Sequence, residues 1–157
     1  MIHRATPRKL AASRTSAIPT SATVRLATLR LYMTALPLLC RTEDVFAVTA
    51  AWTETGITWN NQPVGTAINN PPAASRTTSF NVGTAVGCQY GAANTYVAAT
   101  VTSDVQAFVS GGKANDGWMI RDDSEGSATA STTTYTAKNA GTMAQAPQLV
   151  ITYVDVP

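Results

Sequence analysis

The alternation of apolar and polar side chains along the chain predicts a fold made mostly of β-strands. Between Val24 and Met33 the two kinds of residue alternate, and Leu29, Leu31 and Met33 share one face. This period of two is typical of a half-buried strand. Further strands are predicted at residues 44–52, 77–82, 95–101, 117–121, 132–137 and 148–154. In the last segment both faces are apolar, which indicates a central strand covered on both sides.

The hydrophobic period changes to that of a helix after residue 100. Apolar positions then fall at i, i+4, i+7 and i+8, on Val101, Val105, Phe108 and Val109. We expect one short helix near residues 103–110, with Thr102 or Ser103 as its N-cap and Gly111 at its end. About seven short strands, separated by turns and accompanied by one helix, predict an all-β fold. The expected architecture is an antiparallel β-sandwich of the jelly-roll type.

The length and composition are those of one folded domain. The 157 residues suffice for a single core, and 13% charged with 45% apolar residues argues against disorder. Seven of the eleven lysines and arginines precede the first acid, Glu43. Because residues 1–16 show no hydrophobic period, we expect a basic, disordered tail there. The sandwich domain is expected at residues 17–157.

Charge and hydropathy exclude two kinds of partner. From Glu43 onward the chain is acidic and lacks a basic stripe with interleaved aromatic residues, so no nucleic-acid partner is expected. No apolar run reaches the length of about 18 residues that a membrane span requires. The basic first residues are not followed by the apolar stretch of a signal peptide, so none is visible in this chain.

Six segments carry a recognisable pattern: ATLRLY (27–32), WTETGITWNNQP (52–63), VTSDVQ (101–106), GWMI (117–120), YTAK (135–138) and PQLVITY (147–153). In this order they resemble the DNRLRE domain, which overlaps carbohydrate-binding module family 96, over about residues 15–153. The segment at residues 52–63 is the most specific. The resemblance implies a jelly-roll β-sandwich of secreted or surface-attached bacterial and archaeal proteins, some of which bind acidic polysaccharide.

The chain departs from the family pattern at both ends. Residues 1–14 replace the one or two strands with which the family normally opens, so one sheet would keep an open edge. The family's closing pair of a base and an acid reads Lys138-Asn139 here, so the acid is absent. The first departure bears on the completeness of the sandwich, and the second bears on any ligand site.

The residues do not form a catalytic set. The single histidine, His3, lies in the expected tail, so a Ser-His-Asp or Cys-His arrangement lacks its base. A glycosidase needs two carboxylates on opposite sides of the scissile bond, whereas three of the nine acids crowd into one turn. We therefore expect no enzymatic activity.

The acids of that region allow a different interpretation. Calcium binds several oxygen ligands, and the candidate ligands are Asp116, Asp122, Asp123 and Glu125. The alternative is that these acids lie in a solvated turn and bind no metal. A structural calcium is therefore an expectation, and no other cofactor is expected.

Candidate sugar contacts are one aromatic residue and three bases. Trp59 opens a loop, where its ring could pack on the apolar side of a pyranose. The alternative for Trp59, which its place next to a strand favours, is a position in the core, as is expected for Trp52 and Trp118. For an acidic polymer the expected contacts are the bases within predicted strands, Arg30, Arg121 and Lys138. The alternative for these bases is that they only keep the strands soluble.

Cys40 and Cys88 form either one disulfide or two buried thiols, and an extracellular setting favours the disulfide. The leading hypothesis is a non-catalytic, secreted or surface-associated carbohydrate-binding module whose partner is a polysaccharide, in particular an acidic one. The alternative is a structural building block of an extracellular appendage or adhesin, with neighbouring protein subunits as its partners.

Overall fold

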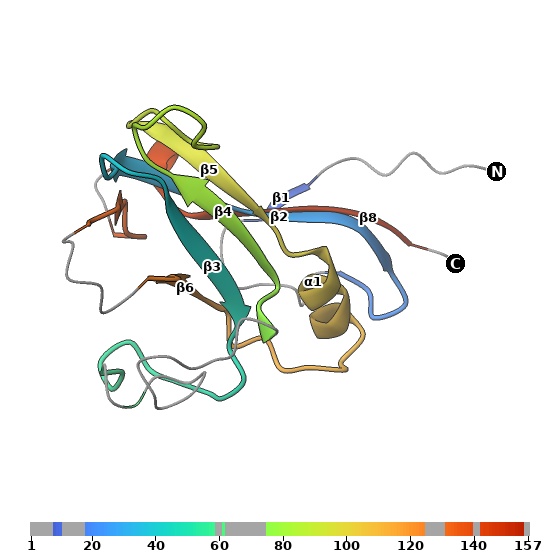
Figure 1. Cartoon of the computed structure of the whole chain (residues 1–157). Coiled ribbons are helices and arrows are strands. Elements are labelled where there is room, and N and C mark those ends of the chain that lie inside the picture. The colour runs from blue at the N-terminus through green and yellow to red at the C-terminus, as the bar shows by residue number, and fades with distance from the viewer. Residues whose placement is uncertain are drawn as a thin grey trace.

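The computed structural model describes residues 8–10, 18–58, 61, 75–124, 131–139 and 142–155, the first three by their backbone alone. Two antiparallel sheets pack on a shared core, and one helix lies at an end of the sandwich (Figure 1). The elements are β1 (Arg8–Leu10), β2 (Thr23–Ala35), β3 (Arg41–Ala47), β4 (Thr78–Val82), β5 (Thr95–Thr100), α1 (Thr102–Val109), β6 (Trp118–Asp122), β7 (Thr134–Tyr135), the 3-10 helix η4 (Met143–Gln145) and β8 (Gln148–Val154).

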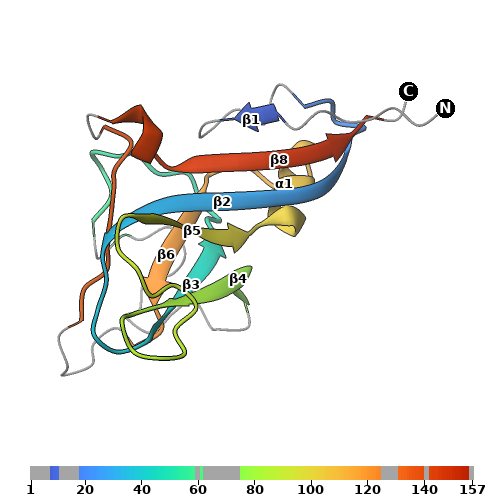
Figure 2. The ribbon, with the colours of Figure 1, turned by 90° about the horizontal axis from the view of Figure 1, so that it is seen from above.

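The larger sheet has the strand order β1-β8-β2-β5, and β7 pairs with the end of β2. Figure 2 shows these strands from above, with β8 running beside β2 from Thr23 to Arg30 of β2. The smaller sheet has the order β4-β3-β6. This arrangement confirms the predicted all-β sandwich, and each segment predicted as a strand overlaps one, although β3 begins and ends earlier than the predicted residues 44–52.

β2 has an irregularity near its start that determines which of its side chains enter the core. The pairing of β2 with β8 shifts register between Val24 and Leu26, so Val24 and Ala27 are buried while Leu26 is 49% exposed. Beyond the shift the alternation is regular, and Leu29 and Leu31 pack against the core from the inner face. The core also takes Met33 from β2, Val45 from β3, Val97 from β5 and Ile151 from β8.

The helix α1 confirms the predicted change of period. Val105 and Val109 are buried against the core, and Gly111 follows the helix with a φ of 75°, a left-handed conformation that favours glycine. The expected N-cap is wrong, because Val101 occupies that position and no side chain caps the helix. The Thr102 hydroxyl instead accepts a hydrogen bond from the Ala27 N–H at 3.0 Å, which joins α1 to β2.

The N-terminal segment corrects a prediction. Residues 8–10 form β1 and pair antiparallel with β8, with Arg8 opposite Ile151 and Leu10 opposite Leu149. A disordered tail over residues 1–16 is therefore wrong for these three residues, and the rest of that segment lies outside the described residues. Three residues are too few for a hydrophobic period, so the pattern could not show this strand.

The strand β5 ends the order of the larger sheet, and a tyrosine from the preceding loop contacts its free side. The Tyr90 hydroxyl donates to the Ala98 carbonyl and accepts from the Ala98 N–H, both at 3.1 Å. The Tyr90 ring also packs edge-on against Phe80 of β4, with the ring centres 6.0 Å apart. These contacts join the edge of one sheet to the other sheet.

Candidate functional site

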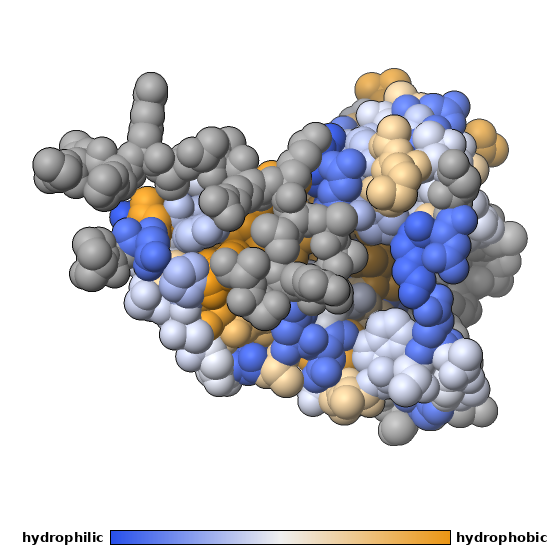
Figure 3. Space-filling view, turned by 180° about the vertical axis from the view of Figure 1, so that it is seen from behind, coloured by the Kyte–Doolittle hydropathy of each residue, from blue (hydrophilic) through white to orange (hydrophobic). Residues whose placement is uncertain are grey.

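A groove of about 660 Å³ opens between the two sheets. Strands β2, β6 and β8 form its walls, together with the loops that contain residues 52–54, 115–117 and 137–138. Figure 3 shows the molecule from behind, where a recessed apolar area lies in the middle of the face among polar and grey residues. A concave surface with an apolar floor and a few polar groups is the usual form of a ligand site.

The floor of the groove follows from strand alternation. Leu29 and Leu31 point inward from β2, Ile120 does so from β6, and Leu149 does so from β8. Each of these side chains is next to a strand neighbour that faces the other side of its sheet. The floor is therefore aliphatic and belongs to the rigid part of the sandwich.

Trp118, the first residue of β6, forms the inner wall of the groove. Its indole N–H donates to Asp104 Oδ2 at 2.9 Å, and its ring centre lies 5.5 Å from that of Phe108. Asp104 is only 5% exposed and also accepts a hydrogen bond from the Thr77 hydroxyl. As predicted, Trp118 packs against the core, and its contacts with α1 hold it in place.

Trp52 corrects a second prediction. It is 46% exposed and lines the groove, whereas the sequence placed it in the core. The strand β3 ends at Ala47, five residues earlier than Trp52, so the indole lies in the loop beyond the strand. Its Nε1–H donates to the Asp116 carbonyl at 2.8 Å. This bond anchors the edge of the ring and leaves ring surface exposed.

Among the described residues, three with charged side chains line the groove. Lys138 Nζ forms an ion pair with Glu54 Oε2, and both side chains are more than half exposed. Asp116 is the third, and its backbone carbonyl holds Trp52. Lys138, which the sequence predicts as a ligand contact, lines the groove, and Glu54 compensates its charge; its contact with a ligand stays a prediction.

The other two predicted bases do not lie with Lys138. The guanidinium carbon of Arg30 is 4.3 Å from the centre of the Tyr96 ring, and Arg30 Nη1 donates to Gln148 Oε1 at 3.1 Å. Arg30 faces away from the inward Leu29, on the outer face of the larger sheet. Arg121 pairs in register with Asp44 of β3 and does not line the groove. The fourth candidate, Trp59, lies outside the described residues.

Two of the four acids proposed for calcium, Asp122 and Asp123, have other contacts. Asp122 accepts two hydrogen bonds from Arg41, at 2.8 and 3.0 Å, and these bonds raise the pKa of Arg41. Asp123 accepts from the Ser124 hydroxyl at 2.8 Å. Within the described residues no three His, Cys, Asp or Glu side chains are grouped to hold a metal. Glu125 lies outside them, and the calcium site stays a prediction.

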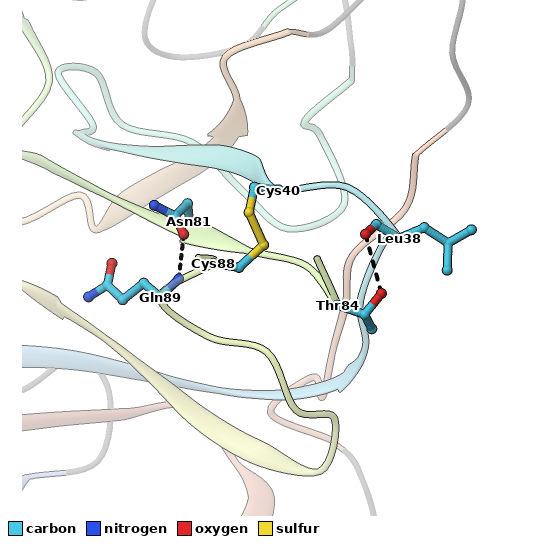
Figure 4. Close-up of a disulfide and its surroundings, with 6 residues drawn as sticks. All are labelled: Leu38, Cys40, Asn81, Thr84, Cys88 and Gln89. Carbon is cyan, nitrogen blue, oxygen red and sulfur yellow. Dashed lines mark hydrogen bonds between the residues drawn. A yellow bond between two sulfur atoms is a disulfide. The ribbon is translucent and has the colours of Figure 1, made fainter. Parts of the chain in front are cut away.

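Cys40 and Cys88 are joined in a disulfide, with their Cα atoms 5.4 Å apart (Figure 4). The bond connects the start of β3 to the loop after β4. Nearby, the Thr84 hydroxyl donates to the Leu38 carbonyl at 3.2 Å, which also holds the two loops together. The sequence left two free thiols as the alternative, and the structure has the disulfide.

A polar contact between Thr133, next to β7, and the buried carboxylate of Glu43 was not predicted. Glu43 is 6% exposed and accepts from the Thr133 hydroxyl at 2.8 Å. Burial, and secondly the negative charge of Glu43, raise the pKa of Tyr135 above its ordinary range. Tyr135 therefore stays neutral at physiological pH. Within the described part of the chain, its buried hydroxyl has no hydrogen-bond partner.

Sequence reasoning missed two residues of the groove, Trp52 and Glu54. Both lie in the segment 52–63, which carried the most specific resemblance, and that signal could have identified them. The described helices include none that is long and apolar enough to cross a membrane.

Comparison with known proteins gives one match. The family model of carbohydrate-binding module family 96 matches residues 6–153, a range that includes β1 and every residue lining the groove. No curated protein and no solved structure matches the chain. With the model covering nearly the whole length, the chain belongs to carbohydrate-binding module family 96.

Proposed function

We propose that the groove between the sheets is the carbohydrate-binding site, and that the exposed face of Trp52 stacks on a sugar ring. The observation that carries the proposal is the position of Trp52. A tryptophan that is 46% exposed beside an apolar groove is unusual, because this side chain is mostly buried. Aromatic rings with one polar edge are the typical anchors of binding surfaces.

Each part of the groove has a role in the proposed binding. Because the Asp116 carbonyl fixes the indole edge, Trp52 loses little conformational freedom when a ligand binds. The aliphatic floor of Leu29 and Leu31 excludes water beneath the ligand. The carboxylates of Glu54 and Asp116 along the margin offer hydrogen-bond acceptors to sugar hydroxyls.

Three further properties belong to the proposal. The module binds without catalysis, as is typical of the family. It works outside the cell, and the Cys40–Cys88 disulfide supports this because disulfides persist in oxidising compartments. Its partner is a polysaccharide.

A structural building block remains the second candidate. Leu38 and Leu39, next to the disulfide, are exposed, and so is Val86 on the loop that the disulfide joins to them. Exposed apolar side chains of this kind favour contact with a neighbouring protein. Concentration-dependent assembly without polysaccharide binding would support this candidate against the first.

The test is retention of the full chain on a panel of polysaccharides in native affinity electrophoresis. Trp52→Ala is expected to weaken retention about tenfold or more, as removal of an aromatic anchor does. Leu26→Ala is the matched control, since Leu26 is similarly exposed and lies outside the groove. Equal retention of both variants and the parent chain would contradict the proposal.

A further inference from the structure

We propose that the Cys40–Cys88 disulfide protects the loop between β4 and β5 from proteolysis, and that its reduction turns the peptide bond between Ala85 and Val86 into a cleavage site. This loop, residues 83–94, leads from the smaller sheet to the larger one. The disulfide ties it to the connection between β2 and β3. The groove lies elsewhere, since residues 83–94 are not part of its described lining.

The loop tip, residues 85–87, is the most accessible part of the loop. Val86 is fully exposed. Gly87 follows with a φ of 96°, and among the described residues no atom lies within 4 Å of the position that a Cβ would take there. Exposed loop tips made of small residues are preferred sites of proteolytic cleavage. A protease that selects aliphatic side chains can therefore recognise Val86.

Hydrogen bonds attach the chain on both sides of the loop tip. Before the tip, the Thr84 N–H donates to the Pro37 carbonyl at 2.9 Å, and the Thr84 hydroxyl donates to the Leu38 carbonyl at 3.2 Å. After the tip, the Tyr90 N–H donates to the Asn81 carbonyl at 3.1 Å. These bonds lie near the surface and break whenever the loop opens locally.

The disulfide is the covalent attachment of the same segment. It holds Cys88, directly after the loop tip, against Cys40, directly before β3 (Figure 4). A protease binds several residues on each side of the scissile bond in an extended conformation. When the hydrogen bonds break, the disulfide still prevents the segment from moving away from β3, so the loop resists cleavage while the disulfide is intact.

The disulfide is accessible to a reductant of the dithiol class. Cys40 is exposed and Cys88 is half-buried. One thiolate of the dithiol attacks a sulfur of the disulfide, and its second thiolate then releases the protein. The two S–H groups of the reductant become one S–S bond, and the S–S bond of the protein becomes two S–H groups. Opening of the loop then requires only the loss of hydrogen bonds.

Cleavage after reduction has an irreversible result. Hydrolysis of the bond between Ala85 and Val86 consumes one water molecule and separates β1–β4 from β5–β8. With the disulfide reduced, the two fragments are joined by non-covalent contacts alone. The same cut in the oxidised protein would leave them covalently linked, because Cys40 and Cys88 lie on opposite sides of it.

The experiment is limited proteolysis of the full chain with thermolysin, which cuts before aliphatic residues. The oxidised chain is compared with a chain that has been reduced, alkylated and desalted, and mass spectrometry follows the cut between Ala85 and Val86. We expect this cut to be at least about tenfold faster in the reduced chain, because cleavage follows the population of the open loop. Near-UV circular dichroism should show that the reduced chain keeps its packed core.

Three variants serve as controls. The double substitution Cys40→Ser and Cys88→Ser should reproduce the fast cut without any reagent. Val86→Gly should abolish the cut at this bond in the reduced chain. Thr84→Val removes a hydrogen bond of the loop and leaves the disulfide, so its oxidised form should be cut within about threefold of the parent rate.

Three results would overturn the proposal. The first is an equal rate of this cut in the oxidised and the reduced chain. The second is cleavage of oxidised Thr84→Val as fast as that of the reduced parent, because the hydrogen bonds would then protect the loop. The third is loss of the near-UV signal on reduction with cuts throughout the strands, because the disulfide would then support the whole fold rather than this loop.

Discussion

Two aromatic residues on opposite sides of the larger sheet differ in how far the protein encloses them: Tyr96 lies on the outer face, and Trp52, from the loop after β3, lies beside the groove. On the outer face, the Tyr96 ring lies under the guanidinium of Arg30, and its hydroxyl is near the carbonyl oxygens of Ala144 and Ala146, at 2.7 and 3.0 Å. The same hydroxyl accepts from the Gln148 amide at 2.9 Å. On the groove side, Trp52 has one intramolecular hydrogen bond, and nearly half of its surface is exposed.

The difference shows how a structural aromatic residue can be told from one available to a ligand. Tyr96 has its ring face and its polar atom occupied by the protein, so it connects β5 to η4 and β8. Trp52 uses its polar edge and keeps ring surface uncovered. Substitution of the first should therefore affect folding, and substitution of the second should affect binding.

The largest expected effect is that of Tyr96→Ala. It removes the contacts with Arg30 and Tyr32 as well as the hydroxyl bonds to η4, so the free energy of unfolding should fall by about 3 kcal/mol. Urea denaturation followed by tryptophan fluorescence measures this change. Trp52→Ala should cost about 1 kcal/mol or less, since surface substitutions are mild. A larger loss of unfolding free energy in Trp52→Ala than in Tyr96→Ala would contradict this prediction.

The next prediction is a smaller difference in unfolding free energy between phenylalanine variants of the two groove tryptophans, Trp118 and Trp52. Trp118→Phe keeps a ring and removes the donor to the buried carboxylate of Asp104, which should cost about 2 kcal/mol. Trp52→Phe removes a donor to an exposed carbonyl and should cost about 0.5 kcal/mol. A double-mutant cycle with Asp104→Asn isolates the first interaction. Equal losses in the two phenylalanine variants would mean that Trp118 is not held by Asp104.

The raised pKa of Tyr135 predicts how the free energy of unfolding depends on pH. The pKa of Tyr135 is raised in the folded protein, so the phenol stays neutral there while it ionises in the unfolded chain above a pH of about 10. The stability that this group contributes is fully present below that pH and is lost as the pH rises further. Tyr135→Phe should therefore flatten the decline of unfolding free energy between about pH 9 and 11. An unchanged slope would show that Tyr135 does not carry this linkage.

The smallest effect concerns the ion pair at the groove. Lys138→Gln should change the free energy of unfolding by less than about 1 kcal/mol, because both partners are exposed. Lys113→Gln serves as the matched surface control. A loss well above that of the control, measured by thermal denaturation, would mean that the Lys138–Glu54 pair supports the loops of the groove.

The predicted strands and the helix came from local periodicity, and those parts of the fold were correct. The end of β3 was not, because the residues between Ala47 and Trp52 are small or weakly polar and do not show where pairing stops. This error moved Trp52 from the loop to the core. β1 was missed because a three-residue strand has no period.

The groove was harder to predict than the fold. Its lining combines Trp52, Asp116 and Lys138, which are far apart in sequence and meet through loops whose path no local pattern specifies. The bases Arg30 and Lys138 looked equivalent in the sequence. Their roles differ because one faces Tyr96 on the outer side and the other faces Glu54 at the groove.

The contact between Tyr90 and Ala98 has a consequence for how the molecules behave at high concentration. A terminal strand with free N–H and C=O groups is a template on which a second molecule can add a strand. At Ala98 both groups already bind one hydroxyl, so an incoming strand has to displace Tyr90 before it can extend the sheet. Tyr90→Phe keeps the ring and removes the hydroxyl, so we expect this variant to self-associate more than the parent chain at high concentration, as measured by light scattering. The hydroxyl of Tyr90 thereby makes the addition of a strand at this point of the edge less favourable than at an edge whose N–H and C=O groups are free.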